Sequence, residues 1–271
     1  MCYATWHAVT PETADRTFFQ NPRSRRCGGF LQPSHRCDCV VWARVIYTEN
    51  AMKRLLAALL ALSAFAVPAA VAESPVLIEL FASKNCRACP KAYKVLGEVD
   101  SARDDVLILT WSVDYWDYLG GKDPMAMGES KDRQRAYVDR FRLRGPYTPQ
   151  TVYNGIEQCP GNKPGKVESA IEKAKKDVPK GVTLTRKGED VVLDGKPPGL
   201  TDIWYVDYLG GEENTTAAIH PVTQVTALGP WLGGRTQIAL PACQSHCAVI
   251  VQEAGFGPVL AAMPLDPPPG H

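Results

Sequence analysis

Two cysteines separated by two residues, Cys86 and Cys89, have the spacing of a redox-active dithiol. Pro90 follows them, and because proline is tolerated in the first turn of a helix, the pair is expected at a helix N-terminus. The unpaired N–H groups there, together with Arg87, favour a thiolate, and a cysteine pKa in such a position falls from about 8.5 to about 3.5–7.5. We therefore expect thiol–disulfide exchange, with Cys86 as the attacking thiolate and Cys89 as the thiol that resolves the mixed disulfide. A structural disulfide is the alternative use of the same pair.

The segments around the dithiol predict the elements that hold it. Residues 76–82 (V-L-I-E-L-F-A) form a nearly continuous apolar run, which is typical of a strand covered on both faces of a parallel sheet. A helical pattern follows the dithiol, and residues 106–111 predict a second strand. Strand, helix and strand in this order indicate a right-handed βαβ unit with a parallel pair of strands.

A carboxyl group interrupts the first apolar run at Glu79. Burial in an apolar strand disfavours the charged form of such a group. A buried acid beside a dithiol can exchange a proton with the resolving thiol. We therefore expect Glu79 to act as the proton relay for Cys89, which completes a catalytic set of Cys86, Cys89 and Glu79.

The remaining pattern of this first region resembles thioredoxin. It predicts a polar helix, two short strands around an Asn-Gly turn and a closing amphipathic helix over residues 131–143, 144–159 and 165–176. In that resemblance Thr148-Pro149 matches the cis-proline step of the fold. The resemblance implies that the residue before this proline offers its backbone to an extended substrate beside the dithiol, so Thr148 and Pro149 are candidate substrate-binding residues.

A short stretch of aromatic and acidic residues follows the second predicted strand, over residues 114–117. Ligands of α/β sheets bind at the carboxyl ends of parallel strands. Tyr115 and Trp116 are therefore candidate substrate contacts. In the alternative interpretation these aromatic side chains only pack an inserted segment, while the aspartates are solvated or paired with Lys122.

The chain also resembles a bacterial family of secreted thioredoxin-like proteins that is known only as a domain of unknown function. The motifs that carry the resemblance are E-L-F-x-S-x-x-C-x-x-C-P from Glu79, V-D-Y-W-D-Y-L-G-x-K-D-P from Val113, Q-R-A-Y from Gln134, Y-T-P-Q from Tyr147 and V-Q-E-x-G-x-G from Val251. The resemblance implies a thioredoxin-like fold outside the cytoplasm. It implies no particular substrate.

A signal peptide is expected over residues 52–72. A basic start at Lys53 and Arg54 precedes an apolar run over residues 55–67, and small residues of the A-x-A type end the segment. The apolar run is shorter than the roughly 20 residues that a membrane-spanning helix needs. We therefore expect a periplasmic or secreted protein with no membrane span after signal cleavage.

Residues 1–51 precede this segment and have no periodic apolar pattern, so we expect a non-native or disordered extension. Cysteine and histidine residues at 27–39 lack the paired C-x-x-C of a zinc knuckle, so no metal site is predicted there. The formal net charge of the chain is +1, which argues against a nucleic acid or an anionic membrane as a partner.

Short strand-like runs separated by Gly, Pro and Asn follow residue 180. The predicted fold class is α/β, with a thioredoxin-like βαβ-ββα domain over residues 73–180, a small antiparallel β-rich domain over 181–264 and a tail over 265–271. Cys243 and Cys247 lie between two of these runs. In a secreted protein they are expected to form a structural, turn-spanning disulfide, and a metal site that includes the intervening histidine is the weaker alternative.

The sequence thus favours an extracytoplasmic thiol–disulfide oxidoreductase without a cofactor, whose partners are protein thiols and disulfides, small thiols or a redox protein. Two alternatives remain open. The first is a periplasmic copper(I) carrier, because soft thiolates select that ion. The second is a non-catalytic binding module in which the Cys86–Cys89 pair is a stable disulfide.

Overall fold

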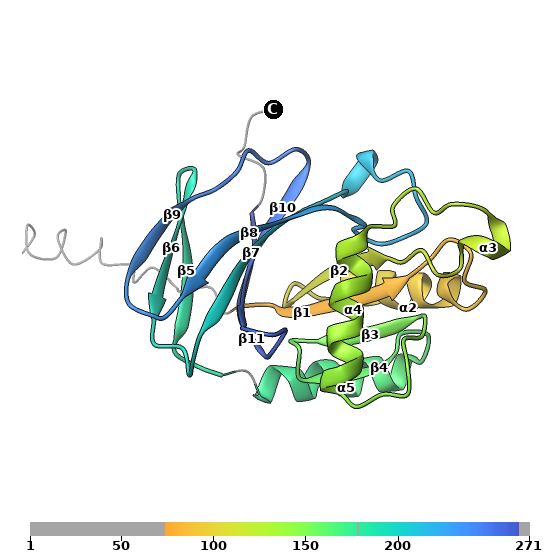
Figure 1. The fold of residues 1–271 in the computed structure, drawn as a ribbon, viewed down its shortest axis with the longest axis horizontal. Helices are drawn as coiled ribbons and strands as arrows, with labels where there is room; N and C mark the ends of the chain where they lie inside the picture. The colour runs from red at the N-terminus through yellow and green to blue at the C-terminus, as the bar shows by residue number, and fades with distance from the viewer. Residues whose placement is uncertain (1–73, 178, 266–271) are drawn as a thin grey trace, which may run out of the picture. The chain divides into compact units, whose positions relative to one another are not determined.

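The computed structural model describes residues 74–177 and 179–265, all of which belong to one compact unit of the chain (Figure 1). The predicted extension over residues 1–51, the predicted signal peptide over 52–72 and the tail beyond Leu265 lie outside the described residues. Within the described part, no helix combines the length and the apolar character that crossing a membrane requires.

The first half of the described chain forms a mixed sheet with helices. Its elements are β1 (Val76–Ala82), α2 (Cys89–Ala102), β2 (Val106–Ser112), α3 (Asp117–Gly120), α4 (Gly128–Arg140), β3 (Gln150–Tyr153), β4 (Glu157–Pro160) and α5 (Pro164–Asp177). The strand order is β2-β1-β3-β4, with β1 and β2 parallel and the other pairs antiparallel. The parallel βαβ unit is confirmed, as is the hairpin, whose turn residues Asn154 and Gly155 both have positive φ.

The second half consists almost entirely of antiparallel strands. Its elements are β5 (Val182–Lys187), β6 (Asp190–Gly195), β7 (Thr201–Tyr208), the short 3-10 helix η2 (Gly211–Glu213), β8 (Val222–Trp231), β9 (Thr236–Ala239), β10 (His246–Glu253) and β11 (Val259–Leu265). They form two sheets with the orders β11-β10-β7-β8 and β5-β6-β9. The predicted α/β class with a β-rich second half is therefore confirmed at this level.

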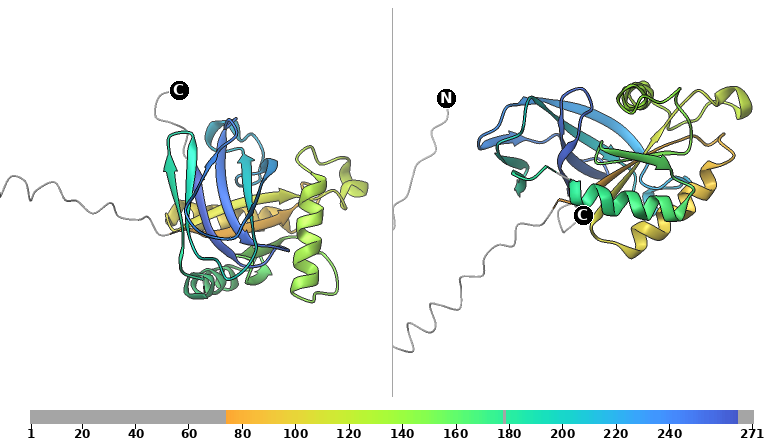
Figure 2. Two further views of the ribbon diagram at one scale, coloured as in Figure 1. Left: turned by 60° about the vertical axis from the view of Figure 1, so that its left-hand side comes forward. Right: turned by 90° about the horizontal axis from the view of Figure 1, so that it is seen from below.

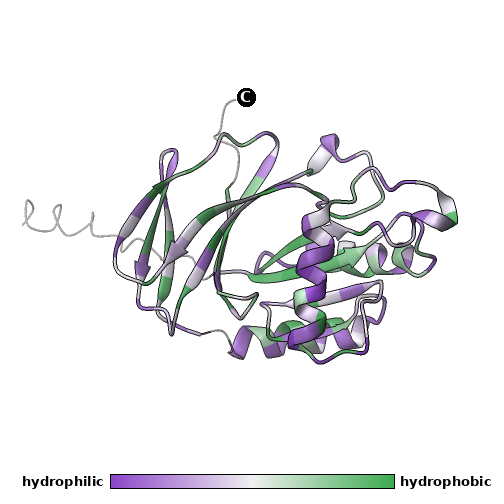
Figure 3. Ribbon diagram, viewed as in Figure 1, coloured by the Kyte–Doolittle hydropathy of each residue, from purple (hydrophilic) through white to green (hydrophobic). Residues whose placement is uncertain are grey.

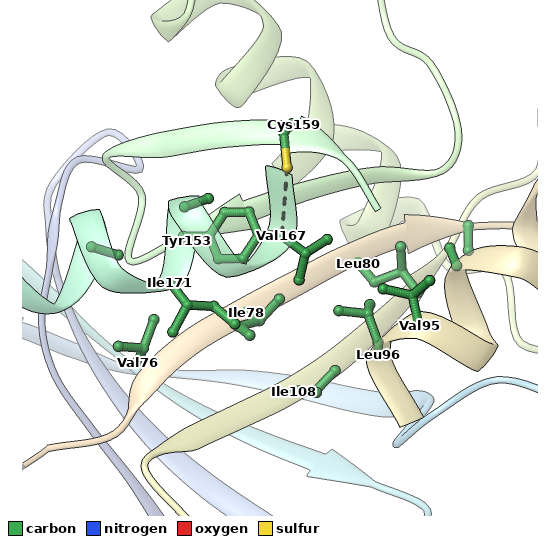
Figure 4. Packing of buried hydrophobic residues seen from close by; sticks show 14 of the residues in the cluster. Val76, Ile78, Leu80, Val95, Leu96, Ile108, Tyr153, Cys159, Val167 and Ile171 are labelled. Carbon is green, nitrogen blue, oxygen red and sulfur yellow. Dashed lines mark hydrogen bonds between the residues drawn. The ribbon is translucent and has the colours of Figure 1, made fainter. Parts of the chain in front are cut away.

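Strand β1 is buried along its whole length, and its two faces pack against different layers. Ile78 and Leu80 point toward α2 and α5, which cover one face of the first sheet (Figures 2 and 4). Leu77 and Phe81 point the other way and pack against residues of β7 and β10. Figure 3 shows the hydrophobic character of β1 that this double burial requires.

The two halves consequently share a hydrophobic core. The predicted boundary near residue 180 lies between α5 and β5, but one buried cluster contains Trp111 of β2 together with Val206 of β7 and Ile250 of β10. Full burial of each such side chain contributes about 1.5–3 kcal/mol. The two halves are therefore layers that stabilise each other through this common core.

A surface cluster of charges ties the end of α2 to β2 and α5. Arg103 donates hydrogen bonds to both carboxylate oxygens of Asp105, at 2.8 and 2.9 Å, and Lys175 donates to the same carboxylate at 2.6 Å. Arg103 first, and then Lys175, hold the pKa of Asp105 well below its usual range. The charged form of Asp105 therefore stabilises the fold, and protonation removes that contribution.

We expect Asp105→Asn to lower the free energy of unfolding by up to about 1 kcal/mol at pH 7, since the group is partly exposed and its ion pairs are screened. A depressed pKa stabilises the fold above the unfolded-state value of about 4, and this contribution is lost as the pH falls further. The difference between variant and wild type should therefore shrink toward pH 2. Urea unfolding at both pH values measures it, and the exposed neighbour Asp104→Asn is the matched control.

Candidate functional site

The cysteines at the start of α2 are bonded to each other, with Cα atoms 5.4 Å apart. Cys86 lies in the turn before the helix, where its carbonyl oxygen accepts the N–H of Cys89 at 3.2 Å. Cys86 retains 6% of its exposed area, and Cys89 retains none. An external sulfur therefore reaches Cys86 first, and Cys89 is the buried member of the pair.

The N-terminus of α2 is electrostatically suited to a thiolate. No acidic residue lies in its first turn, and no side chain caps it. Pro90 occupies the first turn, as the sequence predicts, and Arg87 is exposed beside the cysteines. The positive end of the helix dipole is therefore not neutralised by a carboxylate of the helix itself, and it favours negative charge on Cys86.

Trp116 joins the dithiol region to the predicted substrate-binding residues. Its ring packs against the cluster that contains Cys86 and Cys89, and its Nε1 donates a hydrogen bond to Oγ1 of Thr148 at 2.8 Å. The peptide bond between Thr148 and Pro149 is cis. The tertiary structure thus brings Trp116 and Thr148, which are distant in sequence, to the same end of the sheet as the dithiol.

Tyr115 is directed differently from its neighbour. It packs against the core between the first sheet and the β7–β10 sheet, whereas Trp116 packs on the α2 side. Its ring still lies 5.7 Å from that of Trp116. Burial raises the pKa of Tyr115. Tyr115 thus contacts Trp116 but packs into the core on the other face of the sheet.

An acidic residue that we did not single out from the sequence holds the dithiol loop in position. Asp123 is buried, and its two carboxylate oxygens accept the backbone N–H groups of Lys84 at 2.8 Å and Met125 at 3.0 Å. Asp117 in turn accepts the N–H of Asp123 at 3.0 Å. Asp117 therefore organises the backbone next to the cysteines and is not only solvated or paired with Lys122, while Asp114 is partly exposed and pairs with Lys131 at 2.9 Å. The D-Y-L-G-x-K-D spacing was the available signal.

Two large apolar side chains are exposed near this loop. Tyr118 and Leu119 on α3 retain 77% and 57% of their exposed area. The ring of Tyr118 lies 6.2 Å from that of Trp116, and Nδ2 of Asn85 donates to the carbonyl oxygen of Gly121 just after α3. We call Trp116, Tyr118 and Leu119 the aromatic rim. It forms an apolar surface beside the residue that precedes Cys86.

Glu79 has partners that differ from those the sequence suggests. Its neighbours Ile78 and Leu80 point toward the α2 side, so strand alternation directs Glu79 to the opposite face. There its carboxylate pairs with Nε of Arg133 and accepts a hydrogen bond from the hydroxyl of Tyr137. The expected proton relay to Cys89 is therefore corrected: Glu79 belongs to an ion pair across the sheet from the dithiol.

The ion pair extends into a buried polar network. Arg133 donates to Oε1 of Gln252 at 2.9 Å, and Nε2 of Gln252 donates to Tyr137 at 2.9 Å. The guanidinium also lies 5.0 Å from the ring of Trp111. Tyr137 and Gln252 are part of the Q-R-A-Y and V-Q-E motifs, so those motifs mark a network that connects β1, α4 and β10. Their spacing alone does not reveal it.

Cys243 and Cys247 are also bonded to each other, with Cα atoms 5.9 Å apart. Within the described residues, these two sulfurs and a carboxylate oxygen of Asp207 lie within 4.8 Å of one another, close enough to be considered as metal ligands. The two sulfurs are joined in this state and so are not available together as thiolate ligands. His246 stacks on Tyr208 instead, with ring centroids 5.7 Å apart.

Comparisons with known proteins agree with the predicted membership of a family of unknown function. The family model described as "Protein of unknown function (DUF1223)" matches residues 77–252, a range that includes both cysteine pairs. An X-ray crystal structure of a protein from Agrobacterium tumefaciens is similar at 27% sequence identity and a TM-score of 0.61, covering 73% of this chain and 99% of that chain. No curated protein matches.

Proposed function

Because the chain belongs to the DUF1223 family of proteins of unknown function, we propose from its own site that it is a thiol–disulfide oxidoreductase with a thioredoxin-like first half, working outside the cytoplasm. One observation carries the proposal. Cys86, which keeps 6% of its area exposed, and Cys89, which keeps none, are joined at a helix N-terminus that has no acidic residue in its first turn. The signal-peptide features of residues 52–72 support the compartment.

The proposed reaction is a reversible exchange of two electrons. In the reduced protein the thiolate of Cys86 attacks a substrate disulfide, which forms a mixed disulfide and releases one substrate thiolate. The thiol of Cys89 then loses its proton to solvent or to the departing sulfur and attacks Cys86. The products are the Cys86–Cys89 disulfide and a second substrate thiol. The reverse sequence oxidises a substrate dithiol.

The surroundings favour an extended polypeptide as substrate. The aromatic rim supplies exposed apolar area. Nε1 of Trp116 positions the side chain of Thr148 by donating a hydrogen bond to its Oγ1 at 2.8 Å. The backbone N–H and C=O of Thr148 make no hydrogen bond with other residues in the described ranges. These groups can pair with an added strand, and side chains of that strand can rest on the rim.

Alkylation of the reduced protein tests the proposal. We expect iodoacetamide to modify Cys86 well before Cys89, with a pH profile whose midpoint lies below the free-cysteine value of about 8.5. Peptide-resolved mass spectrometry measures each thiol separately, and the chain unfolded in urea supplies the reference profile. A midpoint at or above about 8.5 in the folded protein would leave no reason to assign catalysis to this pair.

A further inference from the structure

The second disulfide is chemically asymmetric. Cys243 lies exposed in the segment before β10, whereas Cys247 on β10 has no exposed area. Thiolate attack on a disulfide depends on access to one sulfur and on the stability of the sulfur that leaves. An external thiol can therefore reach Cys243, and the leaving sulfur would be the buried one.

A buried carboxyl group touches that leaving sulfur. Asp207 on β7 is directly opposite Cys247 in the strand register, and only 3% of its area is exposed. Its Oδ1 lies 3.2 Å from Sγ of Cys247 and accepts the backbone N–H of Gln244 at 3.3 Å. Burial raises the pKa of Asp207, which favours the protonated acid, while the Gln244 N–H works in the opposite direction.

A purely structural disulfide does not explain this arrangement. The bond closes a sequence separation of 4, and cross-links that close short loops constrain the unfolded chain less than those that close long ones. Burying a carboxyl group also costs free energy unless its oxygen atoms make hydrogen bonds or pair with a charge. Here the acid points at the one sulfur that would carry negative charge when the bond is cleaved.

We propose that Cys243, Cys247 and Asp207 form a second thiol–disulfide exchange site, in which Cys243 is attacked and Asp207 protonates Cys247. A thiolate of a substrate dithiol forms a bond with Sγ of Cys243, and the Cys243–Cys247 bond breaks. The electron pair passes to Sγ of Cys247, which takes the proton of Asp207. The second thiol of the substrate then attacks the mixed disulfide and releases the substrate as a disulfide and Cys243 as a thiol. The dithiol is oxidised by two electrons, and this site is reduced by two.

The test follows the reduction of this disulfide by dithiothreitol in the full chain, with samples quenched by alkylation and resolved by peptide. Asp207→Asn is expected to slow reduction of Cys243–Cys247 about 100-fold, the low end of what a positioned acid contributes. Asp202→Asn, on the same strand but opposite Gln252, is the matched control and should leave the rate unchanged. Because the Cys86–Cys89 pair is followed separately in the same samples, failure of one site is distinguishable from failure of the other.

A second pair of variants does not depend on Asp207. With Cys247→Ser, the remaining Cys243 should react rapidly with an aromatic disulfide reagent, whereas with Cys243→Ser, the remaining Cys247 should react at least about tenfold more slowly, as its burial requires. Equal reduction rates for wild type and Asp207→Asn would overturn the role of the acid. Faster reaction of Cys247 than of Cys243 would overturn the assignment of the attacked sulfur.

Discussion

Replacing Cys89 with serine is expected to turn the protein into a trap that keeps its substrates bound to Cys86 through mixed disulfides. The first attack needs only the thiolate of Cys86, the more exposed of the two, whereas release needs the fully buried thiol at position 89. Covalent complexes should therefore accumulate, be visible on non-reducing gels and be cleaved when a reductant is added. Mass spectrometry of the trapped species identifies the partners, and their chemistry shows whether proteins or small thiols predominate.

Cys86→Ser is the matched control for the trap. It removes the attacking sulfur, so few or no mixed disulfides should form at this pair. In a background in which Cys243 and Cys247 are both serine, turnover of a model disulfide should fall to the uncatalysed rate. Both variants lose one sulfur of the same pair, and therefore lost stability alone cannot explain a difference between them. Equal trapping by the two variants in the background without Cys243 and Cys247, or catalysis that survives Cys86→Ser there, would refute the assignment of nucleophile and resolving thiol.

Glu79→Gln is expected to lower the free energy of unfolding by about 3–5 kcal/mol, the usual cost of removing one partner from a buried ion pair. Arg133 would remain buried, with 3% of its side chain exposed, among the rings of Trp111 and Phe256. Urea unfolding measures the change. Glu98→Gln, an exposed position on α2, is the control and should alter stability by less than about 0.5 kcal/mol.

A double variant separates the ion pair from other effects of the substitution. Glu79→Gln combined with Arg133→Met removes both charges and should recover part of the stability that the single variant loses. The exchange rate of the Cys86–Cys89 pair should stay unchanged in every variant that remains folded, because Glu79 faces away from the dithiol. A stable Glu79→Gln protein with slowed resolution of mixed disulfides would contradict this account and restore the proton relay.

The buried polar network around Arg133 connects the two halves of the chain. Arg133 and Gln252 are 119 residues apart in sequence, yet they join α4 of the first half to β10 of the second. Together with the shared apolar core, this hydrogen bond couples the layer that contains the dithiol to the β-rich layers. We therefore expect the two halves to unfold together, although their sequence patterns suggest a boundary near residue 180.

Local sequence signals were sufficient for the dithiol and its immediate supports. The C-x-x-C-P order predicts that the cysteine pair lies at a helix N-terminus, since the N–H that proline lacks is one that has no partner within the helix anyway. The apolar run before it predicts β1, and the Asn154-Gly155 pair predicts the hairpin, because only such residues accept two consecutive positive φ angles easily. Each of these conclusions depends on neighbours within a few positions.

Tertiary structure decided what the remaining polar groups do. In an apolar run that is buried on both faces, the sequence does not indicate toward which layer Glu79 points, and its partner Arg133 lies 54 positions away. Asp207 and Cys247 are also far apart in sequence, with a separation of 40 positions. Their contact is set by the pairing of β7 with β10, and the register of that pairing depends on the whole sheet. The residue types thus determined which chemistry is available, while the packing of the layers determined which acid meets which thiol or cation.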